Sequence, residues 1–198
     1  MRARRSLKLA GIQAGHGDIS EKWLELLREV VPHASRFAHL GDPNTPMSPI
    51  FVRRILGAAR TLGVSVEFFP ITKPDDVEPQ LAAMTRARVK GIIVDATPMP
   101  RTRQKEIVAF AAANRVPVMY AGRDYVDVGG LMSYDASRPD MGRRGAYYID
   151  RILKGMKPAD LPVEEPTKFE FIINLKTASA LGLSIPSPLL QRADHVIH

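Results

Sequence analysis

The sequence contains no cysteine among its 198 residues. A disulfide framework, a thiolate metal site and a cysteine nucleophile are therefore excluded. It also contains no run of roughly 18 consecutive apolar residues, the length that a transmembrane helix needs. The hydrophobic content of 45% is enough to build a core, and the length suits one ordinary domain or two small lobes. We therefore expect a globular protein without a membrane span.

Excess positive charge is scarce outside the N-terminus. The formal net charge is +7, but four of the basic residues lie within the first eight positions: Arg2, Arg4, Arg5 and Lys8. Further along, basic and acidic residues alternate, as in "EKWLELLREV", which is typical of a solvated helix face. We therefore expect no nucleic-acid partner. The stretch "LKLAGIQAG" is too short and too interrupted for the apolar region of a signal peptide, so residues 1–16 are predicted to be an irregular basic tail.

Sequence motifs of catalysis are also absent. There is no GxSxG, HExxH, P-loop or GxGxxG pattern. Of the five histidines only His195 and His198 are three residues apart, and their place at the C-terminus favours a solvated tail over a metal site. His39 lies in an apolar stretch, which favours a buried histidine satisfied by a partner over a catalytic one. We expect no enzyme, no cofactor and no metal.

Helical and strand patterns alternate along most of the chain. Residues 18–31 have apolar side chains at i, i+3 and i+4 spacing and predict an amphipathic helix with Asp18 or Ser20 as its N-cap. Buried strands are predicted at 36–40, 64–71, 91–96 and 116–120, separated by helices at 48–63, 74–89 and 102–115. This order is typical of an α/β fold with a doubly wound parallel sheet.

The last third departs from this rhythm. A helix is predicted at 138–155, then a proline-rich connector, a strand at 167–175 and a short helix that ends at Gly182. We therefore assign residues 17–135 to an α/β lobe. Residues 136–198 are assigned to a crossing helix, connector, strand and C-terminal cap of the same domain.

Polar residues follow three of the predicted strands, in "GDPNTP", "DATPMPR" and "YAGRDYV". Open parallel sheets bind ligands beyond the carboxyl ends of their strands, so these segments supply the candidate ligand-binding residues: Asp42, Asn44, Thr97, Pro98, Arg101, Tyr120, Arg123 and Tyr125.

The candidates differ in how well a simple turn would explain them. Asp42 and Asn44 are equally typical of a turn that caps the next helix. Arginine and tyrosine are not turn formers, and they offer a carboxylate partner and flat stacking surfaces. This favours a ligand role for Tyr120, Arg123 and Tyr125.

Three stretches carry a resemblance to a known family: "GGLMSYD", "RRGAYYIDRILKGMKPADLPVEEPTKFEFIINLKTASALGL" and "IPSPLLQRADHVIH". Over residues 17–198 the chain resembles the ABC transporter substrate-binding proteins of the tryptophan/tyrosine-type family. The resemblance implies a periplasmic-binding-protein-like fold of type I, with a ligand held between two lobes, and adds Ser133 and Tyr134 at the crossing to the candidate site. It also implies a periplasmic location and an ABC permease as partner.

The resemblance further implies that the chain is an N-terminally truncated member, consisting mainly of the C-terminal lobe. Apolar surface around residues 147–153 would then be exposed and promote self-association. We predict a solute-binding component of an ABC importer that binds an amino acid or another small carboxylate without catalysis. The alternative is a ligand-sensing domain of a transcriptional or signalling regulator, because the same fold serves both roles.

Overall fold

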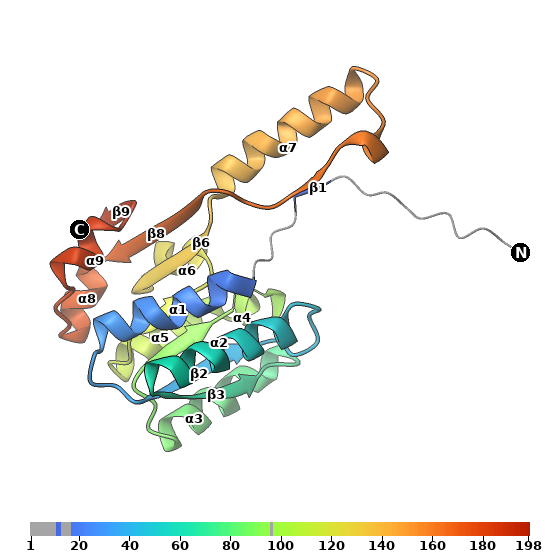
Figure 1. Ribbon diagram of the computed structural model, residues 1–198. Coiled ribbons are helices and arrows are strands. Elements are labelled where there is room, and N and C mark those ends of the chain that lie inside the picture. The colour runs from blue at the N-terminus through green and yellow to red at the C-terminus, as the bar shows by residue number, and fades with distance from the viewer. Residues whose placement is uncertain (1–10, 13–16, 96) are drawn as a thin grey trace, which may run out of the picture. The chain divides into compact units, whose positions relative to one another are not determined.

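The computed structural model describes residues 11–12, 17–95 and 97–198, and these form two compact units (Figure 1). The large unit contains residues 17–135 and 170–198, and the small unit contains residues 11–12 and 136–169. Residues 1–10 and 13–16 of the predicted tail lie outside the described residues. The predicted division of the chain into domains stays a prediction.

A seven-stranded sheet organises the fold, in the order β3-β2-β4-β5-β6-β8-β9. Adjacent strands from β3 to β6 are parallel, as are β8 and β9. The strands are β2 (Arg36–Gly41), β3 (Ser65–Pro70), β4 (Ile92–Val94), β5 (Val118–Tyr120), β6 (Met132–Ala136), β8 (Phe169–Asn174) and β9 (His195–Ile197).

Helices follow most of these strands and cover both faces of the sheet. Apolar residues of α1 and α2 belong to one core cluster, and those of α3 and α5 belong to another. The helices of the large unit are α1 (Gly17–Val30), α2 (Ser48–Leu62), η1 (Pro74–Asp76), α3 (Val77–Arg86), α4 (Pro98–Thr102), α5 (Gln104–Ala113), α6 (Arg123–Asp127), α8 (Leu175–Leu181) and α9 (Ser187–Gln191).

Side chains of the central strands alternate between the two clusters, as the pleat requires. In β4, Ile93 packs with the α1 and α2 cluster, whereas Ile92 and Val94 pack with the α3 and α5 cluster. In β5, Met119 packs with the α1 and α2 cluster, whereas Tyr120 packs with the α3 and α5 cluster. Burial on both faces explains the continuous apolar runs of these strands, and the predicted doubly wound α/β fold is confirmed.

The small unit pairs a long helix with a two-stranded sheet. Helix α7 (Arg138–Leu153) begins after Ser137, whose hydroxyl accepts the amide of Asp140 at 3.4 Å. Strands β1 (Gly11–Ile12) and β7 (Val163–Glu164) are parallel, and η2 (Pro158–Asp160) precedes β7. Tyr148 is buried and its hydroxyl donates to the carbonyl of Pro162 at 2.8 Å. The apolar residues around it that stay exposed are Tyr147, Ile149, Ile152 and Leu153.

Several local predictions were wrong. Helix α1 begins at Gly17, so Ser20 lies inside the helix and does not cap it. The segment after Tyr120, for which no helix was predicted, contains helix α6, which an ion pair of 3.3 Å between Arg123 and Asp127 supports at i, i+4 spacing. The extra helix α4 begins with Pro98, because proline suits a first helical turn.

Candidate functional site

The carboxyl ends of β2, β4 and β5 lie at one edge of the large unit's sheet, which we call the carboxyl edge. Leu40 is paired with Val94, and Val94 with Tyr120, so the three strands end side by side. The segments that follow are therefore neighbours, although they are far apart in the sequence. This edge is the usual ligand-binding region of open parallel sheets.

Five buried side-chain atoms at this edge have no hydrogen-bond partner in the described part of the chain. Native proteins contain few such atoms, yet here all five fall within residues 95–125. We call these residues the polar cluster: Asp95 (Oδ2), Thr97 (Oγ1), Arg101 (Nε), Tyr120 (hydroxyl) and Tyr125 (hydroxyl).

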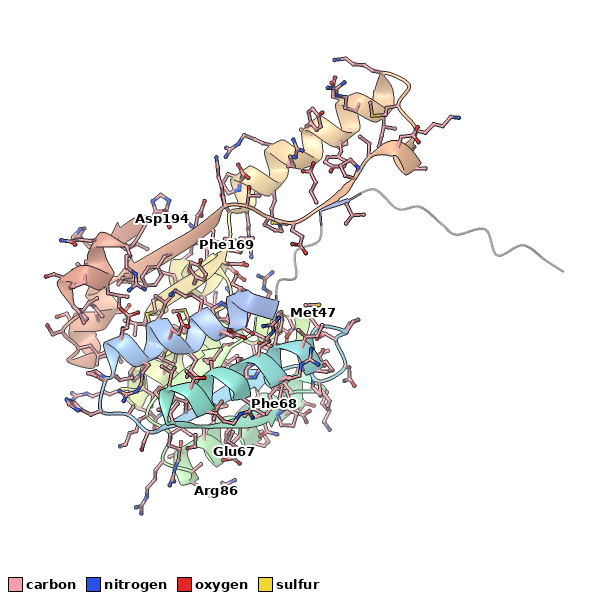
Figure 2. The ribbon with its side chains drawn as sticks, in the orientation of Figure 1. Met47, Glu67, Phe68, Arg86, Phe169 and Asp194 are labelled. Atoms are coloured by element: carbon pink, nitrogen blue, oxygen red, sulfur yellow. The ribbon has the colours of Figure 1, made fainter. Side chains whose placement is uncertain are left out.

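Asp95 is fixed by a buried pair with His39. Its Oδ1 lies 2.7 Å from Nε2 of His39, and the two side chains are 0% and 1% exposed. The ring of Phe68, labelled in Figure 2, lies 5.1 Å from the His39 ring. The prediction of a buried histidine satisfied by a partner is confirmed. Because Oδ1 is held by His39, Oδ2 is the oxygen left for another donor.

Gly41 makes room for this carboxylate. A Cβ atom at position 41 would lie 2.2 Å from Oδ2 of Asp95, so no larger residue fits without displacement. The last residue of β2 therefore has to be small for Asp95 to occupy its place beside His39.

Tyr120 and Tyr125 stack on each other, with ring centroids 4.7 Å apart and an interplanar angle of 13°. Burial raises the pKa of both phenols. The carboxylate of Asp124 raises the pKa of Tyr125 further, Arg101 lowers it by a smaller amount, and Asp95 raises it by the least. Both hydroxyls therefore stay protonated at neutral pH and can donate a hydrogen bond.

Arg101 is the cation of the polar cluster. Its Nη2 donates to Oδ1 of Asp124 at 3.3 Å, and the two side chains are 34% and 26% exposed. Arg103, two residues further on, lies on the surface and pairs with Glu106 at 2.6 Å and Asp75 at 3.4 Å. The two arginines thus have different surroundings, and only Arg101 has a buried donor without a partner.

The remaining candidates have other surroundings. Asp42 is buried and its Oδ1 accepts the amide of Asn44 at 2.9 Å, which is the geometry of an Asx turn. Arg123 is half exposed and pairs with Asp127. Pro98 begins α4. A ligand role for Asp42, Asn44, Pro98 and Arg123 stays a prediction.

Ser133 and Tyr134 lie on β6. Ser133 is buried and pairs in register with Tyr120, at the end of β5. Tyr134 packs on the opposite face, with its ring centroid 6.3 Å from that of Phe171. Burial raises the pKa of Tyr134, and its carbonyl accepts the indole N–H of Trp23 at 2.8 Å. Tyr134 is therefore not a member of the polar cluster, and its ligand role also stays a prediction.

The polar cluster offers one carboxylate oxygen, one guanidinium N–H and three hydroxyls to a bound molecule. Such a set can hold a molecule that carries both hydrogen-bond donors and acceptors. In the described part of the chain, no group of three or more His, Cys, Asp or Glu could hold a metal ion. No helix in this part is both long and apolar enough to cross a bilayer.

Structural comparison finds proteins of similar fold. A protein from Vibrio cholerae matches 94% of this chain with a TM-score of 0.85 and 22% identity. A Streptococcus pneumoniae ABC domain in complex with L-Trp matches 98%, with a TM-score of 0.83 and 25% identity. The ligand-free, open structure of a Clostridium difficile substrate-binding protein with adhesive properties matches 98%, with a TM-score of 0.71 and 21% identity.

This chain spans 62%, 68% and 65% of the lengths of these three proteins, in the same order. No curated protein sequence matches it. The sequence model of the ABC transporter substrate-binding protein family matches residues 6–197, which is nearly the whole chain. The chain therefore belongs to the family of ABC transporter substrate-binding proteins.

Proposed function

We propose that the chain binds a small solute that carries both a carboxylate and an ammonium group, and that the polar cluster supplies the contacts. The carboxylate would accept from Arg101, and the ammonium group would donate to Oδ2 of Asp95. The hydroxyls of Thr97 and Tyr125 serve either group. An amino acid has this pair of charges, and the L-Trp bound to the S. pneumoniae relative supports this class of solute.

The observation that supports the proposal most is the gathering of unpartnered buried atoms. An unpaired buried polar atom costs about 1–3 kcal/mol, so five in one region need partners that the folded chain does not provide. A bound solute with donors and acceptors provides them. The solute then stays chemically unchanged and is delivered to an ABC permease, which would place the protein in the periplasm or at the cell surface.

A thermal-shift screen of the twenty amino acids and of small carboxylates, followed by calorimetric titration of the hits, tests the proposal. We expect at least one amino acid to raise the melting temperature, and Arg101→Ala to weaken its binding at least tenfold. Arg103→Ala is the matched control and should leave the affinity unchanged, because its partners are Glu106 and Asp75. Mass spectrometry should recover the solute unaltered after prolonged incubation.

Two results would contradict the proposal. One is equal affinity in the Arg101→Ala and Arg103→Ala variants, which would remove the polar cluster from the site. The other is a chemically altered solute, which would indicate an enzyme.

A further inference from the structure

A groove of about 480 Å³ lies at the opposite edge of the large unit's sheet, where β4 and β5 begin. We call it the amino-edge groove. Its volume falls within the range of roughly 300–1,000 Å³ that small-molecule sites have. Its apolar floor comes from the end of α1 and the turn after it, from the residue before β5 and from a residue after α8: Val30, Val31, Ala34, Pro117 and Leu183.

The rim of the groove is basic. His33, Lys90 and Arg115 line it and are exposed. The segments that precede β2, β4 and β5, at 31–36, 86–91 and 113–117, contain five lysines and arginines and no aspartate or glutamate. Within the described residues none of these five forms an ion pair. They are Arg36, Arg86 (labelled in Figure 2), Arg88, Lys90 and Arg115.

Helix ends explain part of this charge. Helices α1, α3 and α5 end at the same edge, and cations near the carboxyl end of a helix stabilise it. Arg36, for example, donates to the carbonyl of Ala87 at 2.8 Å, just after α3. Stabilising a helix end does not, however, require a strained backbone, and two of the five basic residues, Arg88 and Arg115, have one.

Arg88 and Arg115 have positive φ angles of 55° and 51°. This left-handed conformation is unfavourable for residues with a side chain and easy for glycine. The chain makes the same turn after α2 and α8, where glycines stand with φ of 65° and 74°. In all four turns the amide of this residue donates to the carbonyl three residues earlier: Gly63 to Arg60, Arg88 to Thr85, Arg115 to Ala112 and Gly182 to Ser179.

The four turns therefore differ in side chain and not in hydrogen bonding. Two of them use glycine, as is usual after a helix, whereas the two beside β4 and β5 carry arginine. Arginine is unfavourable at a position with positive φ, so the simplest reason for its presence is a contact that its side chain makes beyond the turn. Arg88 and Arg115 both lie at the edge of the sheet that holds the amino-edge groove, and Arg115 lines this groove.

We propose that the amino-edge groove binds a small amphipathic carboxylate. Its apolar body lies on the floor formed by Val30 and Leu183, and its carboxylate lies between Lys90 and Arg115. An inorganic anion would leave the apolar floor unused, and a neutral apolar molecule would leave the unpaired cations unused. The site is separate from the polar cluster, which lies at the other end of the same strands.

Calorimetric titration with decanoate tests this site, with decyl maltoside as the neutral amphiphile of equal chain length. We expect one decanoate to bind per chain, more weakly as salt is added because the contact is ionic. The double variant Lys90→Glu/Arg115→Glu should lose at least tenfold in affinity. Equal binding of decyl maltoside, or unchanged affinity in the double variant, would overturn the proposal, as would binding to anionic phosphatidylglycerol vesicles without binding of free decanoate.

A glycine variant separates binding from folding. Arg115→Gly should melt no lower than the native protein, because glycine suits φ of 51°, and yet bind decanoate at least threefold more weakly. Gly63→Arg is the matched control: it places an arginine in the equivalent turn after α2, so it should melt lower and keep its affinity.

A third variant tests whether the two sites are independent. Arg101→Ala should leave decanoate binding unchanged. Loss of decanoate binding in Arg101→Ala, with retention in Lys90→Glu/Arg115→Glu, would place the carboxylate at the polar cluster and overturn the assignment to the groove.

Discussion

Gly41→Ala adds a single methyl group, yet it should destabilise the large unit strongly. The added Cβ would lie 2.2 Å from Oδ2 of Asp95, whereas ordinary contact begins at 3.4 Å. The carboxylate would have to retreat by about 1.2 Å, the difference between these two distances. Its bond of 2.7 Å to His39 would then break. Both partners are almost completely buried, so water cannot replace the bond.

The size of the destabilisation follows from the steric clash and from the lost hydrogen bond. An overpacked core costs typically 1–3 kcal/mol, and a buried group left without its hydrogen bond costs about 1–3 kcal/mol. We expect the free energy of unfolding to fall by about 3 kcal/mol. At about 2–4 °C per kcal/mol for a chain of this length, the melting temperature should fall by roughly 6–12 °C.

Urea unfolding followed by tryptophan fluorescence measures this change. Trp23 is the single tryptophan and is 2% exposed, so its emission should shift when the large unit unfolds. Gly57→Ala is the matched control: its Cβ would meet only Arg60 Nη2 at 4.0 Å, and alanine favours the helix by roughly 0.5–1 kcal/mol. In an Asp95→Ala background Gly41→Ala should cost much less, because the clashing group is gone. A loss below about 1 kcal/mol in the native background would refute the reasoning.

Three further predictions follow from single side chains. Tyr125→Phe should leave the free energy of unfolding within about 1 kcal/mol of the native value, because the Tyr125 hydroxyl has no partner. The same variant should bind the solute more weakly in calorimetry, and equal affinity would exclude this hydroxyl from the site. Burial raises the folded-state pKa of Tyr120 and Tyr125. The stability that they confer is therefore complete below about pH 10, the ordinary pKa of tyrosine, and is lost as the pH rises further. Ultraviolet titration should show two of the five tyrosines ionising only as the protein unfolds, and their ionisation in the folded protein would contradict this prediction. Asn174→Ala should cost about 1 kcal/mol in urea unfolding, because Oδ1 of Asn174 accepts the amide of Thr177 at 3.0 Å and caps α8; a change near zero would show that the cap contributes nothing.

Periodicity predicted the architecture well because the central strands are buried on both faces. The runs that became β4 and β5 are apolar and fully buried, and β2 is apolar and buried apart from the exposed Arg36 and the buried His39. A parallel sheet between two layers of helices buries such runs on both faces. Helix α2 was equally predictable: it begins at Ser48-Pro49 and ends before Gly63, whose φ of 65° suits glycine. The short elements α4, α6, α9, β6 and β9 were missed, since their few residues carry no complete period.

The candidate site was only partly predictable. Strand ends are visible in a sequence, so Thr97, Arg101, Tyr120 and Tyr125 could be chosen before the structure was known. The pair between His39 and Asp95 joins residues 56 positions apart, and no local pattern announces it. The role of Gly41 depends on where the Asp95 carboxylate lies, which is also a property of the folded chain alone.

The two edges of the sheet carry charges of opposite sign because all the helices between parallel strands run in the same direction. Helices begin at the carboxyl edge and end at the amino edge, so acidic residues suit the first and basic residues the second. The segments at 41–47, 71–76, 95–103 and 121–127 accordingly hold six aspartates against four lysines and arginines, whereas the amino-edge segments hold bases alone. Helix ends thus account for the sign of each edge, but not for an aspartate buried beside Gly41 or an arginine with positive φ. Those two features are therefore the observations on which the two proposed binding sites depend.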